Sequence, residues 1–158
     1  MEKLTLKPVG KVCSDGEGTR IVLDKEYIPA LAGLEGFSHI CVLWWFSDFD
    51  SPDMRSYYQS PSPYKGGPQV MGTFATRGPV RPNPIALTNV GVQHIDSENG
   101  IIEIDWIDAH DQTPVLDIKP YTPSSDRVLS ASVPDWCAHW PKSLEGSEGF
   151  DWSAQFNF

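Results

Sequence analysis

Two stretches of the chain concentrate residues whose side chains do chemistry. In residues 72–85 (GTFATRGPVRPNPI), Arg77 and Arg81 stand among three prolines: Pro79, Pro82 and Pro84. Each proline fixes its own φ and restrains the residue before it, so this backbone is expected to be stiff and extended. Two guanidinium groups in such a frame can bind an anionic ligand, and the free backbone groups beside them are available to the same ligand. The alternative is a rigid surface loop whose arginines pair with acidic neighbours.

The second stretch, residues 108–121 (DAHDQTPVLDIKPY), interleaves carboxylates with a lysine and a tyrosine. On an extended chain Asp117, Lys119 and Tyr121 project from the same face, because side chains alternate with period two. A carboxylate, an ammonium and a phenol in a row can bind a zwitterion, shift the pKa of a neighbour or move a proton. The alternative is a solvent-facing strand with an Asp–Lys pair, which adds little stability.

The histidines and cysteines point less clearly to chemistry. His39 precedes an apolar run and fits a hydrogen-bonded structural role, while His110 lies between aspartates with no second histidine at ligand spacing. Aromatic packing is the simpler interpretation of Cys137 and His139, which stand between two tryptophans. We therefore predict no metal site. The three cysteines are distant from one another and are expected to be free thiols in a reducing cytoplasm: Cys13, Cys41 and Cys137.

Short apolar or alternating runs predict most of the elements that must position these residues. Strands are expected over residues 4–12, 19–23, 40–46, 69–75, 86–94, 100–107 and 115–118. In the sixth of these, alternation places Ile102, Ile104 and Trp106 on one face. Residues 28–34 favour one or two helical turns, and residues 51–68, with four prolines, predict a long loop. Many short strands and few helices favour a β-barrel or sandwich, and no dinucleotide-binding glycine motif is present.

Composition limits the class of protein. The 158 residues suit about one domain, and a hydrophobic content of 40% excludes an intrinsically disordered chain. The formal net charge of −9 repels nucleic acid and anionic membranes at long range, although it leaves room for a local basic patch. The longest apolar run, residues 40–46, is far too short to span a membrane, and the first residues lack the apolar segment of a signal peptide. We expect a soluble cytoplasmic protein.

The two chemical stretches together resemble the TsaA/TrmO family. The resemblance rests on residues 74–77 (FATR), 81–85 (RPNPI) and 113–121 (TPVLDIKPY), with residues 33–40 (GLEGFSHI) similar to a third family block. It runs from about Pro8 to Asp126. It implies a small β-barrel methyltransferase that uses S-adenosylmethionine, acts as a homodimer and holds the cofactor near the subunit interface. The best-known member of the family methylates N6 of a threonylcarbamoylated adenosine beside the anticodon of tRNA.

The resemblance also implies roles for individual residues. The cofactor-binding residues would be Phe74, Thr76, Arg77, Pro82, Asn83, Asp111, Thr113 and Pro114. The catalytic residues would be Asp117, Lys119 and Tyr121. His39 and Arg81 would bind the substrate. In such a site Arg77 can pair with the cofactor carboxylate, Asp117 and Tyr121 can face its sulfonium, and Lys119 or Tyr121 can assist a weakly nucleophilic nitrogen.

The chain departs from the family pattern at three positions. Gln112, Gly78 and Ala86 stand where the family commonly has Gly, Ser and Gly. A glycine at the first position would permit an unusual backbone angle that glutamine adopts less readily. Residues 131–158 form a Trp-rich tail where the tRNA-acting bacterial relatives carry a further domain, and we expect this tail to pack on the barrel or on a partner subunit.

These observations predict a mainly β fold: a small single-domain β-barrel over residues 1–130, with few short helices, a long Pro/Gly-rich loop and a tail over residues 131–158. The predicted activity is S-adenosylmethionine-dependent methylation of tRNA, on N6 of a threonylcarbamoylated adenosine next to the anticodon. One alternative is the same chemistry on a small molecule or a protein. Others are a non-catalytic module that binds S-adenosylmethionine and, more distantly, an interaction protein.

Overall fold

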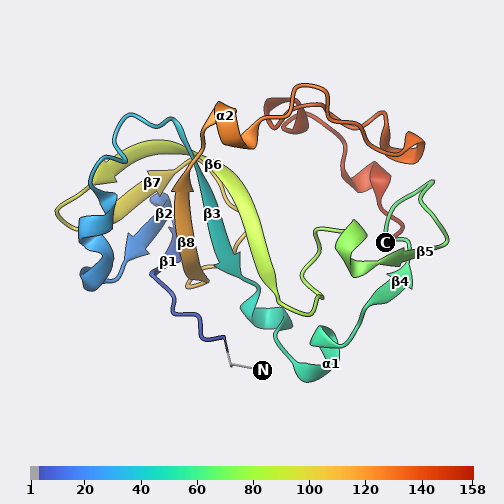
Figure 1. Ribbon diagram of the computed structural model, residues 1–158, viewed down its shortest axis with the longest axis horizontal. Helices are drawn as coiled ribbons and strands as arrows, with labels where there is room; N and C mark the ends of the chain where they lie inside the picture. Colours follow the sequence, from blue (N-terminus) through green and yellow to red (C-terminus); the bar gives the residue numbers. More distant parts are fainter. Residues whose placement is uncertain (1–3) are drawn as a thin grey trace.

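Six antiparallel strands close into a barrel in the computed structural model, which describes residues 4–158 (Figure 1). The order around the barrel is β1-β2-β7-β6-β3-β8. The bounds are β1 Gly10–Asp15, β2 Gly18–Leu23, β3 His39–Trp45, β6 Ile85–Asp96, β7 Ile101–Ile104 and β8 Pro114–Pro120. The prediction of a mainly β barrel is confirmed.

The remaining elements are short. Two single-turn α-helices, α1 Pro52–Arg55 and α2 Pro123–Asp126, flank the barrel, and β4 Gln59–Pro61 pairs with β5 Val70–Gly72 in a separate two-stranded ribbon. The 3₁₀ helices are η1 Lys25–Leu31, η2 Ser47–Phe49, η3 Thr73–Ala75, η4 Asp135–Cys137, η5 Glu145–Ser147 and η6 Ser153–Gln155. Within residues 4–158 no helix has the length and apolar character that crossing a membrane requires.

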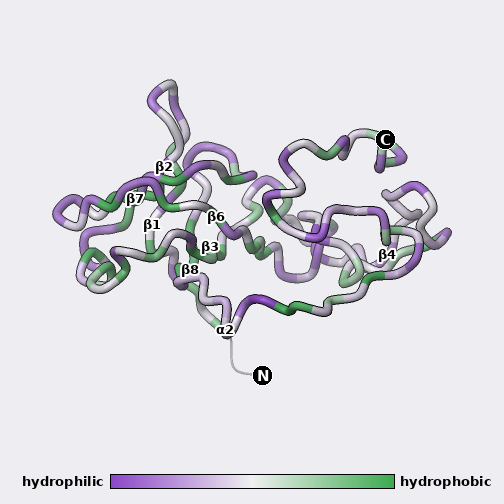
Figure 2. The backbone as a smooth tube through the Cα atoms, turned by 90° about the horizontal axis from the view of Figure 1, so that it is seen from above, coloured by the Kyte–Doolittle hydropathy of each residue, from purple (hydrophilic) through white to green (hydrophobic). Residues whose placement is uncertain are grey.

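The barrel interior is filled by the inward positions of every strand, and the hydrophobic stretches run along these strands in Figure 2. In β3, Ile40, Val42 and Trp44 point inward and are almost fully buried. The alternate residues of β3 therefore point out of the barrel, toward the same side as the outward residues of β6 and β8 on either flank. We call this three-stranded surface the outer face, because it carries several of the residues singled out above.

The structure corrects several expected elements. The first strand begins at Gly10 rather than at residue 4, and the predicted helix is the 3₁₀ helix η1, with Pro29 inside it. The expected long loop of residues 51–68 contains α1, capped by the Ser51 hydroxyl, and β4. Trp106 does not share the buried face of Ile102 and Ile104. It is 63% exposed, because β7 ends at Ile104.

The chain beyond α2 leaves the barrel and joins the β4–β5 ribbon, on the opposite side of Figure 1 from β1 and β2. Tyr64 is the centre of this contact: its ring stacks on Trp136 with centroids 5.5 Å apart and meets Trp140 edge-on at 5.1 Å. Backbone bonds fix the register, from Lys65 N–H to the Gln155 carbonyl (2.8 Å) and from Asn157 N–H to the Pro63 carbonyl (2.9 Å). We call Tyr64, Trp136, Trp140, Trp152 and Phe156 the aromatic cluster.

Candidate functional site

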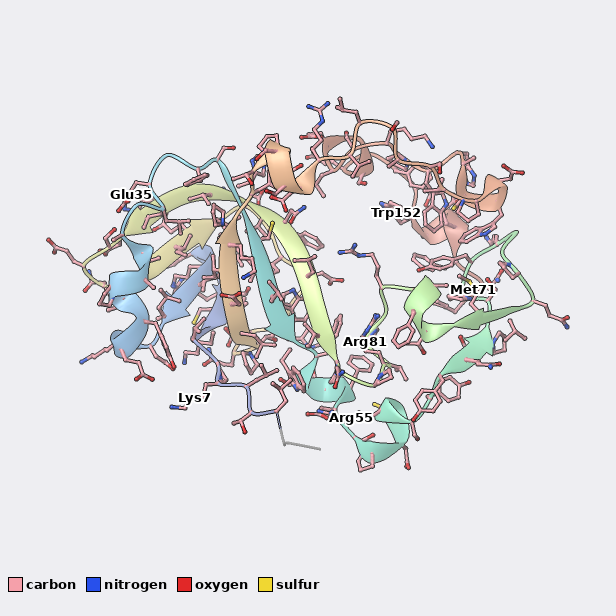
Figure 3. The ribbon with its side chains drawn as sticks, in the orientation of Figure 1. Lys7, Glu35, Arg55, Met71, Arg81 and Trp152 are labelled. Carbon is pink, nitrogen blue, oxygen red and sulfur yellow. The ribbon has the colours of Figure 1, made fainter. Side chains whose placement is uncertain are left out.

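The proline-rich loop between η3 and β6 braces itself with its own arginines. Arg81 Nη1 donates to the carbonyl oxygens of Gly78 (2.9 Å) and Thr76 (3.4 Å), so part of this side chain holds the loop in shape. Arg77 Nη2 donates to the Leu87 carbonyl on β6 (2.8 Å) and ties the loop to the barrel. Figure 3 shows Arg81 between the barrel and the ribbon. The stiffness inferred from the prolines is thus accompanied by hydrogen bonds that fix both arginines.

A pocket of about 330 Å³ opens beside these arginines, and we call it the arginine pocket. Its lining includes Thr76, Arg77, Arg81, Leu87 and Asp108. A neighbouring pocket of about 220 Å³, the aromatic pocket, shares Trp44, Phe46 and Asp108 with it and adds Asp48, Phe49, His110 and Thr113. The two pockets therefore form one continuous depression with guanidinium groups at one end and aromatic rings with carboxylates at the other.

The residues expected to bind a cofactor are only partly brought together. Thr76 and Arg77 line the arginine pocket and Thr113 lines the aromatic pocket. Phe74 lies outside both, with its side chain 86% exposed, and Asn83 is also exposed. The other three expected residues, Pro82, Asp111 and Pro114, line neither pocket and have other contacts or positions. The Pro82 carbonyl accepts a bond from Arg55 of α1, Pro114 opens β8, and Asp111 accepts the backbone N–H of Ser14.

The turn before β8 contains the one described non-glycine residue with a left-handed backbone. Gln112 has a φ of 65°. Its side chain accepts a bond from Lys11 Nζ (2.6 Å) and donates to Asp111. The bonds that Asp111 accepts from Ser14 and Gln112 hold the pKa of its carboxyl below the usual value. The position where the family commonly has glycine therefore keeps the glycine-like backbone angle with a glutamine side chain.

Asp117 and Lys119 lie on the outer face, as the alternation predicted. Across the sheet, Leu87 of β6, Leu43 of β3 and Asp117 of β8 form one row. Asn89, Cys41 and Lys119 form the next. Lys119 Nζ donates to Asp117 Oδ2 at 2.5 Å, and this bond raises the pKa of Lys119 above its usual value. Lys119 is therefore a stable ammonium group at neutral pH.

Tyr121 lies just beyond the end of β8, beside His39. Its N–H donates to the His39 carbonyl (3.0 Å), and the two rings meet edge-on with centroids 6.3 Å apart. Both residues line a third pocket, of about 500 Å³, together with Asn89 and residues of the tail. We call it the tail pocket. It contains one expected catalytic residue and one expected substrate-binding residue, while Arg81, the other expected substrate-binding residue, lies in the arginine pocket.

Sequence reasoning missed Trp44, Leu87 and Asn89 as pocket residues. In the sequence Trp44 and Leu87 look like ordinary strand residues, and no motif around Asn89 marks it as a binding residue. Asp108 was visible as a carboxylate of the second stretch, but its place beside Arg77 depends on the path of the chain between β7 and β8. His110 lies 2.8 Å from the Asp48 carboxylate, and both side chains are exposed. Residues 4–158 contain no group of three or more His, Cys, Asp or Glu side chains arranged to hold a metal ion.

Comparison with known proteins gives consistent results. Residues 7–127 match the model of the tRNA-methyltransferase O N-terminal domain. A tRNA (adenine(37)-N6)-methyltransferase of Escherichia coli is 36% identical over 141 residues, which are 88% of this chain and 57% of that protein. A probable S-adenosyl-L-methionine-binding protein of Methanocaldococcus jannaschii is 36% identical over 121 residues, 77% of this chain and 94% of that protein.

Among solved structures, TrmO from Pseudomonas aeruginosa superposes with a TM-score of 0.64 at 26% identity, over 85% of this chain and 62% of that one. The chain thus spans less than two thirds of the length of the E. coli enzyme and of this solved structure.

Proposed function

The chain belongs to the family of the tRNA-methyltransferase O N-terminal domain, and we propose that it methylates N6 of adenine 37 in tRNA with S-adenosylmethionine as the methyl donor. The observation that carries this proposal is the continuous arginine and aromatic depression next to the outer face that bears Lys119. The family resemblance further supports an acceptor adenine that carries a threonylcarbamoyl group.

The residues of the depression fit the chemical groups of S-adenosylmethionine. When bound, this cofactor supplies a methyl group on a sulfonium centre, together with an amino-acid zwitterion and an adenine. Arg77 offers a fixed guanidinium group for a carboxylate. Phe46, which is partly buried and meets the buried Trp44 ring edge-on at 4.6 Å, offers an aromatic ring to a cation or a heterocycle, and Asp108 adds a carboxylate nearby.

Lys119 suits the role of stabilising negative charge on the acceptor. Its raised pKa keeps it protonated at neutral pH, so it is a poor base but a good donor to a nitrogen or oxygen that becomes electron-rich. Asp117 holds the ammonium group in place through the 2.5 Å bond. Asp117 lies in the same row as Leu87 of the arginine pocket and two strand spacings from it, about 10 Å, which is within reach of one bound nucleoside.

We also propose that the active form is a homodimer. Large apolar side chains at or near the pockets are uncovered: Leu129 (85% exposed) and Leu87 (48%) line them, and Phe74 (86%) lies two residues before Thr76. Uncovered apolar groups around polar pockets are typical of protein interfaces. A second copy of the chain is the partner that the family resemblance favours.

Calorimetric titration of S-adenosylmethionine tests the cofactor assignment. The wild-type protein is expected to bind, and Arg77→Ala is expected to weaken binding about 10- to 100-fold, because a charge-assisted hydrogen bond is lost. The matched control is Arg20→Ala: Arg20 pairs with Asp15 on the β1–β2 hairpin, away from the pockets. Equal affinity of Arg77→Ala and wild type would refute the assignment of Arg77.

A methyl-transfer assay then separates the candidate functions. Incubation with tRNA is expected to yield methylated adenosine and S-adenosylhomocysteine, and Lys119→Ala is expected to lower turnover with little change in cofactor affinity. Unchanged turnover with weaker cofactor binding would remove Lys119 from the chemistry. Cofactor binding without any S-adenosylhomocysteine, with tRNA or with candidate small molecules and proteins, would favour the sensor alternative.

A further inference from the structure

We propose that the tail pocket binds a ligand in which an oxyanion lies next to an N–H group. Arg127 and Lys142 would bind the oxyanion, and Asn89 would accept the hydrogen bond of the N–H group. This inference rests on the proposed function, because it assigns the tail pocket to the methyl acceptor. The chemical class of ligand is an adenine nucleoside whose oxyanion is either a carboxylate on the substituent of N6 or a phosphate of the RNA chain.

The tail pocket is built from two unlike parts of the chain. His39, Asn89 and Tyr121 contribute the barrel side, while Arg127 follows α2, and Lys142 to Glu145 belong to the tail. Figure 1 shows the tail leaving α2 at the end of the barrel and passing over to the ribbon, so that its first residues lie nearest the barrel. A volume of about 500 Å³ is within the usual range for a small-ligand site.

The charged side chains that line this pocket differ in how many hydrogen bonds and ion pairs they already make. Asp126 accepts the Thr122 N–H at 2.7 Å, so its carboxylate already serves the turn of α2. Lys142 Nζ donates to the Ala138 carbonyl, which leaves further donors on the ammonium group. Within residues 4–158 neither Arg127 nor Lys142 has a carboxylate at ion-pair distance. Asp126 and Glu145 are the two carboxylates that compete with a bound anion. The pKa of the Glu145 carboxyl is lowered first by its backbone bond and its bond to Ser143, and then by the charges of His39 and Arg127.

Asn89 supplies the second, independent observation. Its Oδ1 is the one buried side-chain oxygen or nitrogen of the described residues that lacks a hydrogen-bond partner. A buried amide oxygen without a donor is unfavourable, so a turn of the Asn89 amide toward the pocket, where Oδ1 meets a ligand N–H, gains a hydrogen bond without displacing another protein group. With that turn the pocket offers an acceptor and two cations, which together match an N–H beside an oxyanion.

The position of Asn89 also links the two pockets. Leu87 and Asn89 are successive outward residues of β6, about 7 Å apart along the strand. Leu87 lines the arginine pocket and Asn89 lines the tail pocket. Lys119 shares the Asn89 row across the sheet. An acceptor in the tail pocket with its N–H side toward Asn89 would thus lie about 7 Å along β6 from the arginine pocket and about 10 Å, or two strand spacings, from Lys119.

The test measures binding of anticodon stem-loop RNA by fluorescence anisotropy at fixed salt. One RNA carries N6-threonylcarbamoyladenosine next to the anticodon and the other carries plain adenosine. The double variant Arg127→Gln/Lys142→Gln is expected to bind the modified RNA about 10- to 100-fold more weakly, because charge-assisted bonds are lost. Glu145→Gln is expected to bind it more tightly, since a competing carboxylate is removed. Arg20→Gln is the matched control and should match wild type.

Each outcome bears on the pocket. Loss confined to the modified RNA identifies the oxyanion as the carboxylate on the base, and equal loss for both RNAs identifies it as a phosphate. Unchanged affinity of the double variant for both RNAs overturns the inference. Asn89→Leu, which removes the acceptor at similar volume, should weaken binding of both RNAs, and no effect would remove Asn89 from the site.

Failure of this inference is distinguishable from failure of the proposed function. If the double variant binds RNA like wild type while wild type still methylates tRNA, the pocket assignment is wrong and the function stands. If RNA binding depends on Arg127 and Lys142 but the protein neither binds S-adenosylmethionine nor transfers methyl groups, the pocket stands and the proposed activity is wrong. In an active enzyme, the double variant should raise KM with little change in kcat, whereas Lys119→Ala should lower kcat.

Discussion

At the scale of single residues, the turn at Gln112 shows how a family-like site is kept with a different side chain. A left-handed backbone is unfavourable for any residue with a Cβ, by about 1 kcal/mol or more. The bonds of Gln112 to Lys11 and Asp111 offset part of this strain. The turn leads directly into β8, and a β-bulge between Val115 and Asp117 then sets the outward phase of Asp117 and Lys119.

Two substitutions separate strain from side-chain contacts at this turn. Gln112→Gly removes the strain and the contacts together, and Gln112→Ala removes only the contacts. We expect the glycine variant to be more stable than the alanine variant by about 1 kcal/mol, measured by urea denaturation. Equal stability of the two variants would show that the positive φ is not strained.

The residue scale also shows what sequence reasoning can and cannot give. Period-two alternation correctly placed Asp117 and Lys119 on one face, because β8 is a regular strand there. The same rule was wrong for Trp106, since β7 ends before it and Asp105 accepts the N–H groups of both Gly91 and Trp106. Asn89 and Arg127 were not foreseen because their neighbours come from segments far away in the sequence.

At the scale of elements, the ribbon and the tail form a second packing unit beside the barrel. The sequence predicted that the Trp-rich tail packs on the barrel or on a partner subunit. In the structure its rings meet Tyr64, which lies in a segment that was expected to be a loop. The aromatic cluster joins Tyr64 to rings that are 72 to 92 positions away in the sequence, and such a pairing has no local signal. In contrast, the barrel strands were largely foreseen, because each carries its own apolar pattern.

Removal of one ring tests whether the aromatic cluster holds the tail. Tyr64→Ala is expected to lower stability by about 2–3 kcal/mol and to expose the tail to protease, because several ring contacts are lost. Tyr57→Ala is the matched control, since Tyr57 is 52% exposed and belongs to no ring pair of the structure. Limited proteolysis followed by mass spectrometry reads out the cleavage sites. Identical digestion of the two variants would contradict this role.

At the scale of the whole molecule, the protein is acidic, but several of its cationic side chains line its pockets. The net charge of −9 opposes RNA at long range, so binding must depend on local contacts at short range. Arg77, Arg127 and Lys142 supply such contacts on two adjoining pockets. A dimer would place a second set of these groups on the same particle.

Analytical ultracentrifugation tests the proposed dimer. The wild-type protein is expected to sediment as a particle of about twice 17.6 kDa, and Phe74→Glu is expected to shift the population toward monomer, because it places a charge on an exposed apolar surface. Phe158→Glu is the control, since this ring is exposed at the end of the chain. A monomer at all concentrations for the wild type would rule out the dimer.

The chain returns at its end to its own middle, where Asn157 and Gln155 bond to residues 63 and 65. Residues 127–154 therefore form a segment that is fixed at both ends, at α2 on the barrel and at the ribbon. Part of this segment forms one wall of the tail pocket. The entropic cost of holding both ends of such a segment in place rises only slowly with its length. Insertions and deletions in residues 128–134 are therefore expected to resize the pocket without unfolding the barrel.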